Sequence, residues 1–417
     1  MNTIESATRS YVETEINKLC GKDQIKRLFG EFSQNSTWKI DDIIKVLIHA
    51  CIENTSIEDV CTSNGMPSAD TVHRRLVNLN LENLDEITNE MVQDISSRAR
   101  FHLNTKITVS FDLHEICFYG DHDKEWIIGM KRKDGTSYAM KFLTATISTG
   151  AIRLPVAVIY LTKERNNKIS EYIESIINDL QLWLNVDKVL LDRGFCNNDI
   201  VEFLDFRGLE YIIAAKRNFD IKEAAETIET TVKEMAKESG VDFKNEYKLG
   251  KWARRNKLDE FYVDYVSTGK GLHPVRLVAV YVRQRTHNKD PLKRWTYCLF
   301  LYITNIDCSA RYIVKQYAKR WIIETDYRCM NVYQAITNSR IPQTRILLFS
   351  LSMALDALWV IASALSTILK DGFKECIREE TVFHISQSNK LVFTGRWFKR
   401  FIRDEIMPLE IICEVIA

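Results

Sequence analysis

Proline and glycine are scarce in this chain of 417 residues, with 6 and 15 copies. This scarcity argues against long linkers between small modules. The formal net charge is only +1, so the charge of the whole chain predicts no nucleic-acid partner, and any such binding must use local patches. The ten cysteines include no Cys-x-x-Cys pair, and no His-x-x-x-His motif stands near them. A structural zinc site is therefore not expected.

A signal peptide, internal repeats and low-complexity tracts are also not recognisable in the sequence. The polar, acidic opening predicts a cytoplasmic protein with reduced thiols. Residues 346–369 are apolar and long enough to cross a bilayer. They include Asp356 and four serines, and a mid-span acid is costly in lipid. We therefore expect a buried core helix rather than a membrane span.

What the sequence does contain is typical of a folded protein of two or three domains, with 46% hydrophobic and 27% charged residues. Residues 1–104 are predicted to be helical. Within them, a short helix over 56–61, a turn containing Gly and Pro, and a helix over 69–79 are similar to a helix-turn-helix. The second helix carries Arg74 and Arg75, which would contact DNA. A plain helical bundle is the alternative interpretation.

From residue 105 the pattern changes to alternating strands and helices. Strands are predicted over 107–111, 139–149, 154–162, 188–191 and 209–215, and helices over 169–184 and 198–206. This order is found in mixed α/β folds of the ribonuclease-H-like type. We assign 105–218 and 305–372 to such a core, and 373–417 to a helical tail. In that tail, 390–403 could contact DNA or a second subunit, or could be a peripheral amphipathic helix.

Between the two parts of the core, residues 219–304 are too long for a plain loop and are predicted to form a β-rich insertion. A charged helix over 221–239 opens it, and the predicted strands are 243–247, 260–267, 275–283 and 295–304. At a predicted strand turn, Trp252, Arg254 and Arg255 belong to a basic cluster that could hold a DNA backbone. A solvated hairpin tip is the alternative.

Three carboxylates suggest the chemistry. Asp112 and Asp192 each follow an apolar strand, and Glu324 is predicted to lie on a helix. If the two strands are neighbours, both aspartates emerge at the edge of an open α/β sheet where ligands bind. Mg²⁺ prefers such oxygen ligands, and two Mg²⁺ ions suit phosphodiester chemistry. A turn or cap residue is the alternative for each aspartate alone.

The predicted Glu324 helix begins near Ser309. Its functional face would carry residues within one arc of roughly 80° at 100° per residue: Tyr317, Arg320, Glu324, Arg328 and Asn331. Such a polar stripe is not what a core requires. An internal Arg320–Glu324 pair at i,i+4 spacing is the alternative.

These blocks resemble DDE transposases of bacterial and archaeal insertion sequences, in the group marked by a Tyr-x-x-Arg-x-x-x-Glu-x-x-x-x-x-x-Lys signature. Tyr317, Arg320 and Glu324 match at the right spacing, and Asn331 stands at the Lys position. The block 192–195 is similar to the second-aspartate block of that family.

Asp112 looks like the family's first aspartate, and the resemblance covers about residues 105–370. It implies a ribonuclease-H-like enzyme that binds terminal inverted repeats, nicks with water and joins the freed 3′-OH to target DNA. Asp112, Asp192 and Glu324 would hold two Mg²⁺ or Mn²⁺ ions. The partners would be double-stranded DNA and a second copy of the chain.

The resemblance also assigns roles to side chains around the acids. Tyr317 and Arg320 would contact a phosphate near the cleaved end, and Arg193 would face DNA. Arg328, one turn before Asn331, could supply the missing charge. In the insertion, Trp252 would stack on a base.

Two other functions fit the same residues. A metal-dependent nuclease of this fold would cut without joining. A non-catalytic DNA-binding protein derived from a transposase would have lost the chemistry, which the three intact acids oppose and Asn331 mildly favours.

Overall fold

The structure is a computed structural model, and it describes residues 10–16, 27–29, 36–63, 65–101, 105–149, 153–241, 246–267, 274–285, 295–370, 382–383 and 399. The predicted C-terminal helix over 390–403 lies outside these residues, apart from Lys399.

The N-terminal region is helical, as predicted. Its helices are α3 (Ile40–Glu53), α4 (Ile57–Val60), α5 (Ala69–Val77) and α6 (Leu81–Ser96). The side chains of Ser56, Ser68 and Asn80 accept hydrogen bonds from the first turns of α4, α5 and α6, which satisfies backbone N–H groups that have no partner within the helix. Of the predicted helix-turn-helix, α4 is a single turn and α5 is the longer helix.

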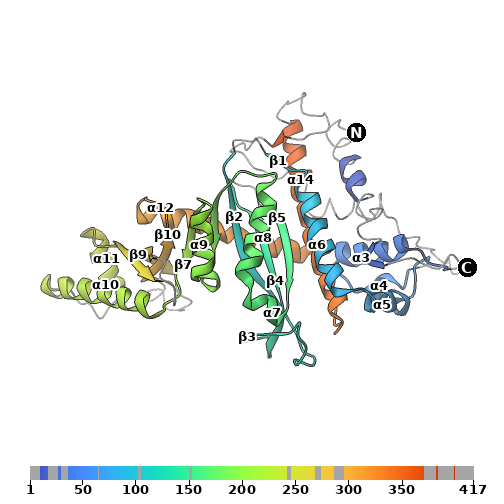
Figure 1. Ribbon diagram of the computed structural model, residues 1–417, viewed down its shortest axis with the longest axis horizontal. Helices are drawn as coiled ribbons and strands as arrows, with labels where there is room; N and C mark the ends of the chain where they lie inside the picture. The colour runs from blue at the N-terminus through green and yellow to red at the C-terminus, as the bar shows by residue number, and fades with distance from the viewer. Residues whose placement is uncertain are drawn as a thin grey trace, which may run out of the picture.

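One nine-stranded mixed sheet crosses the molecule (Figure 1). Eight strands follow in the spatial order β3 (Ile128–Lys133), β4 (Thr136–Ile147), β2 (Ile107–Cys117), β6 (Val186–Leu191), β7 (Glu210–Ala214), β10 (Trp295–Thr304), β9 (Pro274–Arg285) and β8 (Glu260–Ser267). The ninth, β5 (Leu154–Leu161), pairs with β4. The pairs β2–β6 and β6–β7 are parallel and the others are antiparallel. The order β5-β4-β2-β6-β7 confirms the ribonuclease-H-like core.

Helices cover both faces of this core. On one side lie α7 (Lys163–Asn167), α8 (Ile169–Gln181) and α9 (Asn198–Phe206), and on the other lie α12 (Ala310–Tyr317), the 3-10 turn η3 (Ala318–Arg320), α13 (Trp321–Met330), the 3-10 turn η4 (Asn331–Tyr333) and α14 (Pro342–Lys370). Successive side chains of β6 point to opposite faces of the sheet and pack against different helices. Val189 and Leu191 pack in one buried cluster with α8 and α9, and Leu190 packs in another with α12.

The outer edge of β5 is covered by α6, whose polar side chains replace the next strand. Asn89 Oδ1 accepts from Val158 N at 3.0 Å, and Asp85 Oδ1 accepts from Tyr160 N at 2.8 Å. Both acceptors lie on α6, so the backbone of this edge strand has partners and is protected from pairing with another chain.

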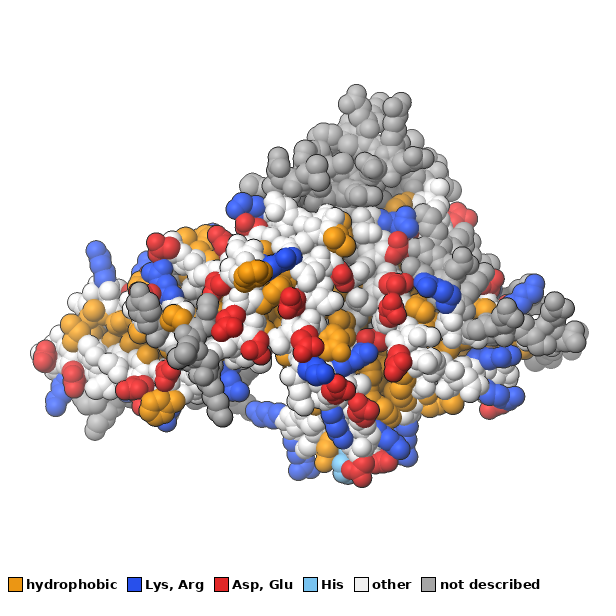
Figure 2. Space-filling model, viewed as in Figure 1, with side chains coloured by type: hydrophobic (Ala, Val, Ile, Leu, Met, Phe, Trp, Pro, Cys, Tyr) orange, Lys and Arg blue, Asp and Glu red, His pale blue; other side chains and the backbone are white. Residues whose placement is uncertain are grey.

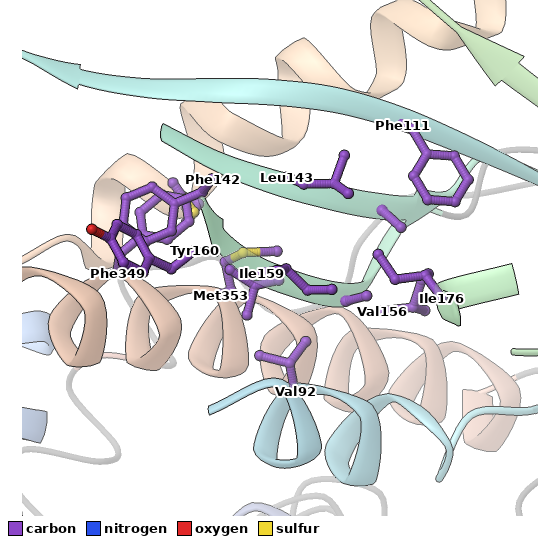
Figure 3. Packing of buried hydrophobic residues seen from close by; sticks show 14 of the residues in the cluster. Val92, Phe111, Phe142, Leu143, Val156, Ile159, Tyr160, Ile176, Phe349 and Met353 are labelled. Atoms are coloured by element: carbon purple, nitrogen blue, oxygen red, sulfur yellow. The ribbon is translucent and has the colours of Figure 1, made fainter. Parts of the chain in front are cut away.

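The apolar helix α14 is the centre of the packing. It is long and apolar enough to cross a membrane over Pro342–Ser363, and 94% of that window is buried inside the molecule, as the core-helix prediction requires. Figure 3 shows Phe349 stacked against Phe142. The two ring centroids are 4.1 Å apart. The figure also shows Met353 close to the strands, on the side of the sheet where Val92 of α6 lies.

The predicted insertion contributes to the same sheet. After α10 (Phe219–Glu238) and α11 (Glu246–Arg255), strand β10 pairs with β7, so β10, β9 and β8 extend the core sheet. The prediction of a strand ending at Tyr247 and a strand turn over 251–257 is wrong. Leu249 and Ala253, four residues apart, are buried against Tyr297, a spacing that favours a helix.

The 3-10 turn η1 (Arg193–Phe195) directly follows Asp192 at the end of β6. Two short strands pair outside the large sheet. Strand β1 (Arg100–Phe101) pairs in parallel with β11 (Val382–Phe383). Both lie in regions predicted from the sequence to be helical, 1–104 and 373–417, and for these residues that prediction is wrong.

Candidate active site

Two of the three predicted acids are neighbours on adjacent parallel strands. Phe111 of β2 pairs with Leu191 of β6, so Asp112 and Asp192 come next on the two strands. The sequence placed Asp112 after its strand, but β2 continues to Cys117 and Asp112 lies within it. Strand β6 ends at Leu191 while β2 continues, so both aspartates lie at the point where β6 ends.

The third acid comes from a helix that begins at the predicted place. Ser309 caps α12, its Oγ accepting from Tyr312 N at 3.3 Å. The chain then tightens into η3 before α13 starts, so the helix is not one regular α-helix. Tyr317 and Arg320 end α12 and η3, and Glu324 lies in the first turn of α13.

Arg320 brings the three acids together. Its Nη1 lies 3.5 Å from Asp112 Oδ2, and its Nη2 lies 3.3 Å from Glu324 Oε1 and 3.9 Å from Asp192 Oδ1. The Arg320 side chain is only 9% exposed. A buried guanidinium requires compensation, and here three carboxylates from β2, from the end of β6 and from α13 supply it.

Burial dominates the electrostatics of Asp112. It raises the pKa of Asp112 to about 6, and the charges of Asp192 and Glu324 act in the same direction. The Arg320 guanidinium and a hydrogen bond from the Leu113 N–H oppose this rise in pKa. Three negative groups therefore converge on one small volume, and a cation is needed to hold them there.

Tyr317 lies beside this cluster. Its hydroxyl is 3.4 Å from Asp192 Oδ1, and its ring lies 5.6 Å from the Arg320 guanidinium carbon. On the other side the ring packs against Tyr302 of β10, with centroids 4.9 Å apart. Burial raises the pKa of Tyr317, so the hydroxyl keeps its proton and can donate to the carboxylate.

A model of the family described as "Transposase DDE domain" matches residues 107–346, which include all three acids. The chain belongs to this family.

Among solved structures, the DDE transposase chain is similar to a cryo-EM structure of the piggyBac transposase synaptic complex with hairpin DNA. The TM-score is 0.51 at 12% identity, over 94% of this chain and 76% of that chain, which supports the fold. A Drosophila P element transposase strand transfer complex gives a TM-score of 0.23 at 12% identity, over 47% of this chain and 42% of that chain. No curated protein matches the sequence.

In this DDE transposase, the Glu324 helix is held against the sheet by a contact that the sequence did not reveal. Tyr327, one turn after Glu324, places its hydroxyl 2.5 Å from Thr144 Oγ1. Thr144 is the ladder partner of Asp112. His114 lies between the rings of Tyr327 and Phe349, with centroids at 4.6 and 4.9 Å. The elements carrying Asp112 and Glu324 are thereby fixed to each other.

A cavity of about 490 Å³ opens beside the acids, between the ends of β6 and β7 and strand β10. Asp192, Arg193, Arg217 and Trp321 are among its lining residues. The indole of Trp321 is 58% exposed. Arg217 lies three residues beyond the end of β7, and its place in this cavity was not predicted from the sequence.

The other predicted contacts lie outside this cluster. Arg328 and Asn331 are exposed near the end of α13. Figure 1 places α11, with Trp252, at one end of the molecule and α5 at the opposite end. Trp252 is partly buried against the core of the insertion.

The remaining arginines on those two helices differ in their surroundings. Arg254 and Arg255 are exposed on α11. Arg74 is paired with Asp70 on the same helix α5, and Arg75 is half-buried there.

The donor set fits a hard divalent cation by its chemistry, because all three groups are carboxylates. Among the described residues, no set of three or more His, Cys, Asp and Glu side chains has metal-binding spacing. The three carboxylates instead face the guanidinium of Arg320.

Proposed function

We propose that the protein is the transposase of an insertion sequence, binding terminal inverted repeats and catalysing DNA cleavage followed by strand transfer. The observation that carries this proposal is the contact of Arg320 with Asp112, Asp192 and Glu324. Acids separated by more than 200 residues in sequence meet at one edge of a ribonuclease-H-like sheet, within a transposase DDE domain.

In the first step, water would attack a phosphodiester at the element's end, and the 3′-oxygen would leave and take up a proton. In the second, that 3′-oxygen would attack a target phosphodiester and release a target 3′-OH, so one phosphodiester forms as one breaks. Asp112, Asp192 and Glu324 would hold Mg²⁺ or Mn²⁺, which supplies activation of the attacking oxygen and stabilisation of the leaving oxygen.

Side chains of the protein around the acids would support the metal ions and bind the DNA. Arg320 holds the carboxylates at one point, and Tyr317 orients Asp192 by donating a hydrogen bond. Arg193 and Arg217 line the adjacent cavity and would bind phosphates. Trp321, largely exposed there, would stack on a base.

Further DNA contacts would come from Arg74 and Arg75 on α5 and from Trp252, Arg254 and Arg255 on α11. These two helices lie at opposite ends of the molecule, so one chain could hold a long stretch of duplex. Pairing two element ends would bring two copies together on DNA, in the cytoplasm at the nucleoid.

The test is a strand-transfer assay with Mg²⁺, a plasmid target and a pre-cut duplex end taken from the DNA that flanks the coding region. Joined product is expected from the wild type, and an Asp192→Asn variant should bind this DNA but neither nick nor join it. Hydrolysis without joined product would identify a nuclease. Absence of both activities, also in Asn331→Lys, would identify a non-catalytic DNA-binding protein.

A further inference from the structure

The hairpin of β3 and β4 extends beyond the catalytic edge of the sheet. Past Asp112, strand β2 runs five more residues to Cys117, which is level with Ala139 of β4. The hairpin then continues to the turn at Asp134 and Gly135, both with positive φ (49° and 87°). At about 3.3 Å per residue, Lys133 lies roughly 25 Å beyond Asp112 along the strands.

Three consecutive cations occupy the free edge of this hairpin. Lys131, Arg132 and Lys133 are all exposed, and within the described part of the chain none of them has an ion pair or hydrogen bond to an acid. The ladder between β3 and β4 is interrupted between Gly129 and Lys133, so two of the three cations lie on a bulge. Figure 2 shows Lys and Arg side chains on the lower projection of the molecule, interspersed with Asp and Glu.

Acidic residues of the same segment, Asp121, Asp123, Glu125 and Asp134, balance its charge overall, and Asp134 directly follows Lys133 at the turn. Asp121 pairs with Lys124 at 3.8 Å, and Asp123 lies 3.9 Å from His122. These four residues lie in the loop that leads into β3. The segment therefore carries almost no net charge as a whole, but three of its cations lie together on β3.

The base of the hairpin is rigid. Phe118 is 2% exposed and packs edge-on against Trp126, with centroids 5.0 Å apart. The guanidinium of Arg345 from α14 lies 5.6 Å from the Phe118 ring, and Thr136 Oγ1 donates to the Phe118 carbonyl at 2.8 Å. A Cβ at Gly120 would overlap the same ring at 2.6 Å. The cations are thus presented in a fixed position relative to the active site.

We infer that the β3–β4 hairpin is a further DNA-contacting element, binding the phosphate backbone of the duplex that lies across the active site, independently of base sequence. The inference rests on the proposed function. A position roughly 25 Å from the acids is within one helical turn of duplex, about 34 Å. Unpaired cations on a rigid support are what backbone recognition requires, because each phosphate neutralised releases a counterion.

A different role for the same lysines is protection of the free edge of β3 against pairing with another chain. The two roles respond differently to charge reversal. An edge stays protected with Glu in place of Lys, whereas phosphate binding turns into repulsion. The variant Lys131→Glu/Arg132→Glu/Lys133→Glu therefore separates them.

The experiment measures binding of the full chain to a 40-base-pair duplex of mixed sequence between about 50 and 200 mM salt. The plot of log K against log[salt] should become shallower by about 0.9 per cation removed, or about 2.7 in Lys131→Ala/Arg132→Ala/Lys133→Ala. The Glu variant should bind more weakly still and keep the oligomeric state of the wild type.

The control replaces three exposed lysines on α10, Lys222, Lys233 and Lys237, by Ala and should leave the slope unchanged. An unchanged slope in the hairpin variants, or an equal change in the control, would overturn the inference while the proposed function stands. A wild-type protein that binds no duplex at any salt concentration would overturn both.

Discussion

Asn54 connects the N-terminal helices to the segment that follows the Glu324 helix α13. Replacing it should slow cleavage without weakening DNA binding. It ends α3 in the left-handed region, with φ 54° and ψ 47°. Its Nδ2 donates to the carbonyls of Asn331 at 3.0 Å and Gln334 at 2.6 Å. Both carbonyls belong to the segment that directly follows α13, three turns or less beyond Glu324.

The magnitude follows from these two bonds. Each contributes about 0.5–1.5 kcal/mol net, so their loss costs about 2 kcal/mol. If the two hydrogen bonds form only when α13 is in the position that cleavage requires, the loss of about 2 kcal/mol corresponds to a cleavage step about 30-fold slower. Asn54→Gly isolates the effect, because Gly accepts the left-handed backbone. Asn54→Ala adds about 1–2 kcal/mol of backbone strain to the stability loss.

The assay is single-turnover nicking of an end duplex at saturating protein, with DNA affinity measured separately. Asn78→Gly is the matched control, since Asn78 ends α5 and, among the residues that the structure describes, its side chain donates only to the Arg74 carbonyl of the same helix, at 3.0 Å. Wild-type nicking by Asn54→Gly would refute the reasoning. So would a loss of DNA affinity equal to the loss of rate, because that would place Asn54 in DNA binding.

Two further predictions concern stability and are read by urea unfolding. Asp356→Leu should cost about 3–5 kcal/mol, because Asp356 is fully buried in α14 with the Arg153 guanidinium at 3.4 Å, whereas the double variant with Arg153→Met should recover most of that loss. An equal loss in both would contradict the ion-pair argument. Gly250→Ala should destabilise α11 although Ala favours helices by about 1 kcal/mol, because the new Cβ would lie 2.2 Å from Tyr297 Cβ. The control Gly129→Ala, where a Cβ would meet nothing within 4 Å, should leave the free energy of unfolding nearly unchanged. A Gly250→Ala protein more stable than the wild type would show that α11 does not pack as described.

The sequence was sufficient to predict that the three acids come close together, and to predict most of the core, because both depend on local patterns. Apolar runs before Asp112 and Asp192 require buried strands, and the Tyr317-to-Glu324 spacing requires one helical face. The same patterns do not say how far a strand continues once one face becomes half-buried. After Phe111 the residues of β2 are only partly buried, which is why its extension to Cys117 was missed.

Contacts between distant segments were beyond such patterns. The i,i+4 pair of Arg320 and Glu324 was considered as an alternative to a functional face, and the structure shows that the two are compatible. Arg320 contacts Glu324 and also both aspartates. Helical periodicity predicts that the two side chains share a face, but only the structure shows that this face meets Asp112 and Asp192.

The carboxylates that we propose as metal ligands are also the structural partners of a buried guanidinium. Removing one of them leaves Arg320 with fewer counter-charges in a site where burial already opposes ionisation of Asp112. A truncation to Ala therefore changes the packing around Arg320 as well as the chemistry, and lost activity in such a variant has two explanations. The isosteric Asp192→Asn keeps an oxygen acceptor near Arg320 and removes one charge. For this reason it is the substitution that connects loss of cleavage to the carboxylate itself.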